Sequence, residues 1–318
     1  MAGADQDQLF TPEPEAPTAE RRLQELNLFV PEHLDLNIDS VFPRVQGWGW
    51  KNEMKQKVKL LNAAQQELSQ MLFEGEEVIY IAKGIRYSFV EFYFMGLWAS
   101  MINHTVFVLT NLRLIMLHTN GKGIPKKTFW MIYYSQIDKF KASWNGMINL
   151  KLKDGKKLAF SGFQKTDRKK LPDAFETALE GYRAAGFAPE TSQSMENLCT
   201  YCKEAIPKNI YDCDDCGAKF WTPGQIAWRS FVFPSWGDFV MGHTTIAVLE
   251  MFGGVIAWLM FVVLLVDGIN TNSAEKVTTA FIMLAIANGI DAAVTAHISR
   301  KGLHPRKGPN PIEASATE

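Results

Sequence analysis

The chain has 318 residues and a formal net charge of −1 at pH 7, which excludes a protein whose whole surface attracts nucleic acid. The small sum conceals a strong segregation of charge. Residues 111–170 carry fourteen Lys or Arg against three Asp, a net of +11, whereas residues 1–80 carry seven Lys or Arg against fourteen Asp or Glu, a net of −7.

The N-terminal region is predicted to be helical behind a disordered tail. Residues 1–20 are rich in Gln, Pro, Glu and Asp and lack the apolar content for a core. Within residues 21–75 we expect a helix from about Asn52 to Phe73 that packs on the following domain or on a partner, with an apolar face of Val58, Leu61, Leu68 and Leu72. No apolar signal stretch follows Met1, so we expect no export.

Residues 76–186 are predicted to form a β domain, because short runs of alternating hydrophobicity follow one another between turn residues. Asp154-Gly155 is a two-residue hairpin turn between the last two runs. Apolar residues at helical spacing then predict a helix that ends before Gly186. Six or seven strands covered by one helix indicate a small, partly open barrel. The expected strands span residues 104–110, 112–118, 129–134, 136–141, 148–153 and 156–161.

Three segments of this domain carry a family resemblance. The sequence FVLTNLRLI at 107–115, YSQID at 134–138 and KLAFSG at 157–162 resemble the bacterial PH-like (YokE/GRAM-like) superfamily, over about a third of the chain. The resemblance implies a PH-like β barrel. That superfamily shares a fold more than a function, so it implies no particular chemistry.

Basic residues of the β domain are candidate contacts for anionic head groups. A basic domain held beside an anionic leaflet gains about 1 kcal/mol for each well-placed cation. The alternatives are an ordinary solvated outer face of the sheet, or a basic face covered by the acidic N-terminal region. The candidates lie on two loops: Lys122, Lys126 and Lys127 on one, and Lys165, Arg168, Lys169 and Lys170 on the other.

The segment 87–102 is almost uniformly apolar and aromatic, with Glu91 as its one charged residue. It is too short to span a bilayer. We expect it to be a buried strand and turn of the barrel; the alternative is a segment at the membrane interface.

All four cysteines follow a linker at 187–197 and form two pairs, Cys199-x-x-Cys202 and Cys213-x-x-Cys216. Two such knuckles surround one tetrahedral Zn²⁺ with four thiolates, so region 198–222 is predicted to be a structural zinc ribbon. The rival interpretations are a redox dithiol and two disulfides. Four protein ligands leave no open position for a catalytic water, and thiolates require a reducing compartment, so we expect this ribbon in the cytosol.

Two apolar segments near the C-terminus, Thr244–Val266 and Val277–Ile298, are long enough to cross a membrane. The lead-in, residues 223–243, is rich in Trp and Phe, as interfacial segments are. Basic residues lie before the first segment and in the tail 300–318, and those of the tail are Arg300, Lys301, Arg306 and Lys307. By the positive-inside bias they predict that both termini lie in the cytosol. This indicates a multi-pass protein of the bacterial inner membrane.

Four polar residues interrupt the apolar segments: Glu250, Asn288, Asp291 and His297. We expect them to lie at similar depths in an antiparallel hairpin, where they either form a proton or ion relay or hydrogen-bond between the helices. Small residues at four-residue spacing predict close packing within the hairpin or self-association into a homo-oligomer: Ala285, Gly289 and Ala293, with Gly253 and Ala257 opposite.

No nucleophile elbow, phosphate-binding loop, zinc-protease motif or dinucleotide fingerprint is present in the sequence, so we do not expect an enzyme. The fold class predicted is multidomain: a mainly-β PH-like barrel with a C-terminal helix, a small zinc ribbon and a two-helix membrane hairpin. The function predicted is a membrane-anchored adaptor that binds anionic phospholipid or an unidentified cytosolic protein. The alternatives are a transporter or channel subunit that uses Glu250 and Asp291, and a membrane-tethered regulator that binds nucleic acid.

Overall fold

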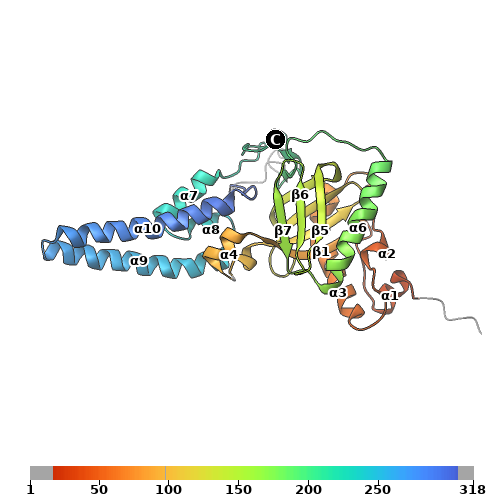
Figure 1. Ribbon diagram of the computed structural model, residues 1–318, viewed down its shortest axis with the longest axis horizontal. Helices are drawn as coiled ribbons and strands as arrows, with labels where there is room; N and C mark the ends of the chain where they lie inside the picture. The colour runs from red at the N-terminus through yellow and green to blue at the C-terminus, as the bar shows by residue number, and fades with distance from the viewer. Residues whose placement is uncertain (1–16, 97, 307–318) are drawn as a thin grey trace, which may run out of the picture.

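A computed structural model describes residues 17–96 and 98–306, and Figure 1 shows a sheet domain from which one long helical hairpin projects. Three helices precede the sheet: α1 (Ala19–Glu25), α2 (Ile38–Val41) and α3 (Trp50–Met71). The expected disordered tail, residues 1–20, lies almost entirely outside the described residues, and so does most of the tail 300–318.

The nine strands of the sheet pair antiparallel in the order β5-β6-β7-β1-β2-β3-β4-β8-β9. The six strands expected in the β domain are present within a few residues of their predicted bounds. Their bounds, with those of the other strands, are β1 Val78–Tyr87, β2 His104–Thr110, β3 Arg113–Thr119, β4 Pro125–Tyr133, β5 Ile137–Ala142, β6 Ile148–Leu152, β7 Lys157–Ser161, β8 Glu196–Leu198 and β9 Ala205–Ile206.

The sheet is not closed, so the expected PH-like barrel is not confirmed. A short 3-10 turn, Tyr134–Gln136, separates β4 from β5. The free edge of β4 pairs instead with β8 of the cysteine segment, where Phe129 lies opposite Leu198. Because β8 occupies that edge, β4 and β5 are not paired with each other, and β5 and β9 are the two outer strands.

Both faces of the central strands are buried, which explains why β2 and β3 are apolar almost throughout. On one face, α3 places Val58 and Leu61 against Ile81 and Val108 in a common core. On the other face, α6 (Lys165–Ala184) covers a second core that contains Phe107 and Phe175. The prediction that the long N-terminal helix packs on the β domain is therefore confirmed.

The apolar segment between β1 and β2 forms two short helices, α4 (Phe89–Met95) and α5 (Trp98–Ile102), rather than a buried strand and turn. Its aromatic side chains point outward: Phe89 is 72% exposed and Tyr93 is 74% exposed. The expectation of core burial is therefore wrong. In Figure 1 α4 lies beside the base of the hairpin, where an aromatic surface faces the membrane interface if the hairpin spans a bilayer.

Four helices follow the cysteine segment: α7 (Pro223–Val232), α8 (Trp236–Val240), α9 (Thr244–Asn270) and α10 (Ala274–Ser299). The pair α9 and α10, with 27 and 26 residues, is long and apolar enough to cross a membrane. Both helices extend beyond their predicted bounds at the ends joined by the connecting turn, the C-terminus of α9 and the N-terminus of α10. The side chain of Ser273 caps α10 by accepting a hydrogen bond from the amide of Lys276, so only a short turn separates α9 from α10.

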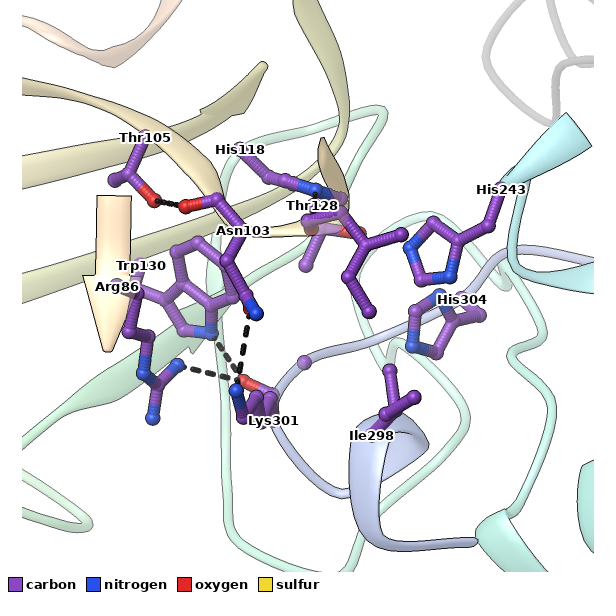
Figure 2. Close-up of a pocket in the computed structure, with 12 residues that line it drawn as sticks. Arg86, Asn103, Thr105, His118, Thr128, Trp130, His243, Ile298, Lys301 and His304 are labelled. Atoms are coloured by element: carbon purple, nitrogen blue, oxygen red, sulfur yellow. Dashed lines mark hydrogen bonds between the residues drawn. The ribbon is translucent and has the colours of Figure 1, made fainter. Parts of the chain in front are cut away.

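The end of α10 is bound directly to the sheet domain (Figure 2). The carbonyl oxygen of Lys301 accepts a hydrogen bond of 2.7 Å from Nε1 of Trp130 on β4 and one of 3.5 Å from Arg86 on β1. Nζ of Lys301 donates to Oδ1 of Asn103 at 3.2 Å and forms an ion pair of 2.5 Å with Oε1 of Glu91 on α4. The hairpin, α4 and the sheet therefore meet at one junction.

Candidate metal centre and membrane junction

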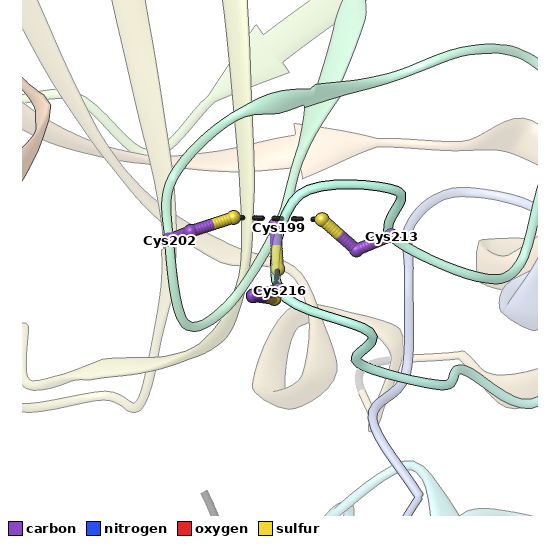
Figure 3. Close-up of side chains that lie close together, drawn as sticks. All are labelled: Cys199, Cys202, Cys213 and Cys216. Atoms are coloured by element: carbon purple, nitrogen blue, oxygen red, sulfur yellow. Dashed lines mark hydrogen bonds between the residues drawn. The ribbon is translucent and has the colours of Figure 1, made fainter. Parts of the chain in front are cut away.

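The four cysteines come together as a single cluster (Figure 3), with all four sulfur atoms within 4.8 Å of one another and no disulfide. Sγ of Cys199 lies 3.6 Å from Sγ of Cys216, and Sγ of Cys202 lies 3.5 Å from Sγ of Cys213. Sulfurs bound to one tetrahedral ion at about 2.3 Å are separated by about 3.8 Å, whereas a disulfide bond is about 2.05 Å long. The arrangement fits a four-thiolate metal site.

The local backbone suits such a site. Gly217 follows the second knuckle with φ of +72°, and Lys203 follows the first with φ of +66°, so both knuckles end in the left-handed conformation. The amide of Tyr201 points at Sγ of Cys199, 3.5 Å away. Burial raises the pKa of Cys199 to about 11. A divalent cation bound by the four sulfurs supplies the positive charge that keeps buried thiolates ionised.

The cysteine segment, residues 198–222, contacts three parts of the molecule: β4, α3 and the residues that follow α10. Oγ1 of Thr200 donates to the carbonyl of Lys127 on β4 at 2.6 Å, and Lys203 forms an ion pair with Glu67 of α3. Phe220 packs with Leu303, which follows α10, in a small core that contains Cys199 and Cys213. A metal held by this cluster therefore stabilises the attachment of the hairpin to the sheet.

The base of the hairpin has its polar residues inside and its apolar residues outside. Oγ of Ser230 on α7 donates to Oγ1 of Thr295 on α10 at 3.0 Å, and both residues are buried. Asn288 donates to the carbonyl of Phe231 at 2.8 Å, so α7 runs beside the half of α10 that is nearer the domain. The exposed residues of α7 and α8 include Trp228, Phe231, Trp236 and Phe239. This arrangement is typical of helices immersed in lipid.

Two of the four predicted intramembrane polar residues come together, and a third carboxylate joins them. Carboxylate oxygens of Glu250, Asp291 and Asp238 lie within 4.8 Å of one another. Asp238 belongs to α8 and was not among the predicted residues, because it lies outside the apolar segments. Asn288 contacts Phe231 instead, and His297 lies 3.8 Å from Glu91, so these two side chains serve other contacts.

The predicted small-residue stripe lies on the outer side of the hairpin. Ala285, Ala293 and Gly253 are exposed, and a methyl group at Gly253 or Gly289 would meet nothing within 4 Å. Two other glycines of α9 pack closely: an added methyl group would lie 3.2 Å from Pro234 at Gly254 and 2.8 Å from Val277 of α10 at Gly268. Self-association through the stripe stays a prediction.

The predicted basic residues fall into two groups on opposite sides of the sheet domain. Lys126 and Lys127 begin β4 next to the hairpin, and Lys122 is exposed on the turn before them. The group Lys165, Arg168, Lys169 and Lys170 lies at the start of α6 beside α3, where Oγ1 of Thr166 donates to Glu53 at 3.0 Å. In Figure 1 α6 is on the side of the domain away from the hairpin, so the two groups do not form one site.

Three buried histidines lie together where the sheet meets the hairpin: His118, His243 and His304 (Figure 2). No pattern in the sequence predicted that they would meet. Nε2 of His118 hydrogen-bonds the carbonyl of Ile102 at 2.8 Å, and Nδ1 of His243 hydrogen-bonds Oδ1 of Asp238 at 3.0 Å. Burial lowers the pKa of His243 and that of His304 to about 3, and the positive charge of Lys126 acts in the same direction. Burial also lowers the pKa of His118 well below its ordinary value, so burial favours the neutral form of all three.

Comparison with known proteins assigns no family to the chain. No family model and no curated protein matches it. Five chains among solved structures match, one of them the C-terminal domain of an unknown protein from Leishmania infantum, with 12% identity and a TM-score of 0.27. That match covers 37% of this chain and 93% of the other. A likeness of this size carries no argument about function, and the resemblance to the PH-like superfamily stays a prediction.

Proposed function

We propose that the protein is an adaptor of the bacterial inner membrane, anchored by α9 and α10, with both termini in the cytosol. In this proposal the sheet domain and a zinc-loaded ribbon bind anionic lipid or a cytosolic protein. Basic residues after α10 support the orientation, because Arg300, Lys301 and Arg306 follow the positive-inside bias. Thiolate ligands support the same side, because they persist in a reducing compartment.

One observation carries the adaptor proposal, namely the direct attachment of the sheet domain to the base of the hairpin. Lys301 is bound by Trp130 of β4 and by Glu91 of α4. The domain is thus held at the membrane in one orientation, which presents Lys122 and its neighbours on β4 to the bilayer surface. A catalytic role lacks comparable support, since the four cysteines form a closed ligand set.

The test is site-specific photocrosslinking of the full chain in native membranes. A photoreactive residue in place of Lys122, on the turn beside the hairpin, is expected to label anionic phospholipid or one cytosolic protein. The same residue in place of Trp48, which is 94% exposed beside the start of α3, is the control and is expected to label neither. Identical, scattered products from both positions would contradict the adaptor proposal.

A transport or channel subunit is the second candidate, favoured by the meeting of Asp238 with Glu250 and Asp291. When three carboxylates lie so close to one another in a helical bundle immersed in lipid, they require bound protons or a cation for stability. Replacement of Glu250 by Gln and Asp291 by Asn discriminates between the candidates. A transporter loses proton or cation flux in proteoliposomes, whereas an adaptor keeps its crosslinks from position 122 unchanged.

A further inference from the structure

A cavity of about 440 Å³ lies between the sheet, the cysteine segment and the base of the hairpin. Lys126 and Lys127 of β4 line one side, and Arg306, which follows α10, lines another. The wall that belongs to the hairpin is apolar and consists of residues 239–241 at the end of α8. Tyr201 of the first cysteine knuckle closes the remaining side, with its ring 5.9 Å from Nζ of Lys127.

The charges in this cavity have the same sign and are not neutralised. Among its described lining residues none is acidic, and in the described part of the chain none of the three cations forms an ion pair. Nζ of Lys126 lies 3.5 Å from the carbonyl of Gly242. Arg306 donates to the carbonyl of Phe220 at 3.2 Å and to Oε1 of Gln225 at 3.0 Å. Lys126 and Arg306 are half-buried and bound by neutral groups, so an anion would stabilise both; Lys127 is exposed at the edge of the cavity.

We infer that this cavity binds the phosphate of an anionic phospholipid head group, with Lys126, Lys127 and Arg306 as its ligands. The guanidinium of Arg306 offers parallel N–H donors to two phosphate oxygens, and the two lysines add point charges. The apolar wall favours a lipid over free phosphate, because Phe239, 39% exposed, lines the cavity where it meets the hairpin and would contact an acyl chain there. The inference rests on the membrane anchoring proposed above and names the ligand of that surface.

The test is lipid titration of the full chain, released from detergent micelles and observed by native mass spectrometry. The probes are phosphatidylglycerol, phosphatidylcholine, diacylglycerol without a phosphate, and inorganic phosphate. The double variant Lys126→Gln/Lys127→Gln is compared with Lys169→Gln/Lys170→Gln, which removes the same charge on the far side of the domain. A loss of about 5-fold per cation, about 30-fold for the pair, is expected in phosphatidylglycerol affinity for the first variant alone.

The inference is supported if wild type and the Lys169/Lys170 variant retain phosphatidylglycerol in preference to phosphatidylcholine and diacylglycerol. It is overturned if the Lys126/Lys127 variant binds phosphatidylglycerol as wild type does, or if both double variants weaken binding equally. Binding of inorganic phosphate without retention of phosphatidylglycerol also overturns it, since the ligand is then a soluble anion. Failure here leaves the adaptor proposal standing as long as crosslinks from position 122 persist.

Discussion

Removal of the Glu91 carboxylate is expected to be among the most damaging single changes at the junction between the hairpin and the sheet. Glu91 is 0% exposed, lies 2.5 Å from Nζ of Lys301 and accepts a hydrogen bond of 2.5 Å from Asn103. Burial lowers the pKa of Lys301 to about 8, and the charge of Glu91 opposes that shift. Glu91→Gln leaves a buried ammonium without its partner, which costs about 3–5 kcal/mol.

A second argument limits this cost. Lys301 escapes the unfavourable charge if it releases its proton. From its ordinary pKa of 10.5, that release at pH 7 costs at most about 5 kcal/mol, at about 1.4 kcal/mol per pH unit. This upper limit agrees with the cost of about 3–5 kcal/mol expected for an unpaired buried ammonium. Replacement of both partners, Glu91→Gln with Lys301→Met, removes the unpaired charge and is expected to cost about 1–2 kcal/mol, less than either single change.

The assay is urea unfolding of the full chain and its variants in one detergent, with hydrogen exchange to localise the effect to α4 and the end of α10. The control is the exposed ion pair of Lys276 with Asp267 at the far end of the hairpin, 2.7 Å long, whose removal is expected to cost less than about 1 kcal/mol. Strictly additive losses in the Glu91/Lys301 double variant would refute the argument, because no buried pair would then be coupled.

Three further outcomes are expected. Gly237→Ala places a methyl group 2.5 Å from side chains of α7 and α10 and is expected to cost about 1–3 kcal/mol in the same unfolding assay, whereas Gly289→Ala meets nothing within 4 Å and is expected to be neutral. Cys202→Ser is expected to abolish stoichiometric zinc, measured by elemental analysis, and to speed hydrogen exchange in β8 and in residues 303–306; full zinc retention would contradict the site. The folded pKa values of His243 and His304, about 3, lie below the ordinary 6.5, so the unfolded chain binds more protons between those values and stability falls as pH drops below 6.5. The expected loss is at most about 1.4 kcal/mol per histidine at pH 5.5, and unfolding free energy that is flat from pH 7 to 5.5 would contradict it.

Local patterns in the sequence were sufficient for six of the nine strands of the described sheet, for the long helices and for the ligand set of the candidate metal site; β1, β8 and β9 were not predicted. Alternation predicted β2 and β3 to within one or two residues. The turn at Asp154-Gly155 joins β6 to β7, but the pairing of Lys151 with Lys157 leaves a three-residue loop, 153–155, instead of the predicted two-residue turn. Cysteine spacing alone indicated that four sulfurs meet, which the structure confirms. These features depend on interactions between residues close together in the chain, which can be predicted from a single sequence.

The features that escaped prediction depend on contacts between distant segments. An apolar run such as residues 87–102 has the same composition whether it lies in a core or at a membrane interface, and only the position of α10 distinguishes the two. The sheet is not closed into the expected barrel, and β8 occupies the edge of β4; the three residues of β8 contain no pattern that would predict this pairing. Asp238 looked like an ordinary polar residue of the lead-in, because its neighbours Glu250 and Asp291 lie far along the chain.

In the proposed function, these long-range contacts would allow a surface of only a few cations to act selectively at a membrane. A domain on a flexible tether samples many orientations, and its lysines meet head groups as part of a diffuse charge. Here Trp130 and Glu91 hold the end of α10 from the sheet side, while Leu303 packs in the core of the cysteine segment. Lys126 is thereby held at one depth relative to the hairpin. In the proposed function, a metal bound by the four cysteines, which lie at most 17 positions apart in the chain, would contribute by holding this orientation rather than by contacting the ligand.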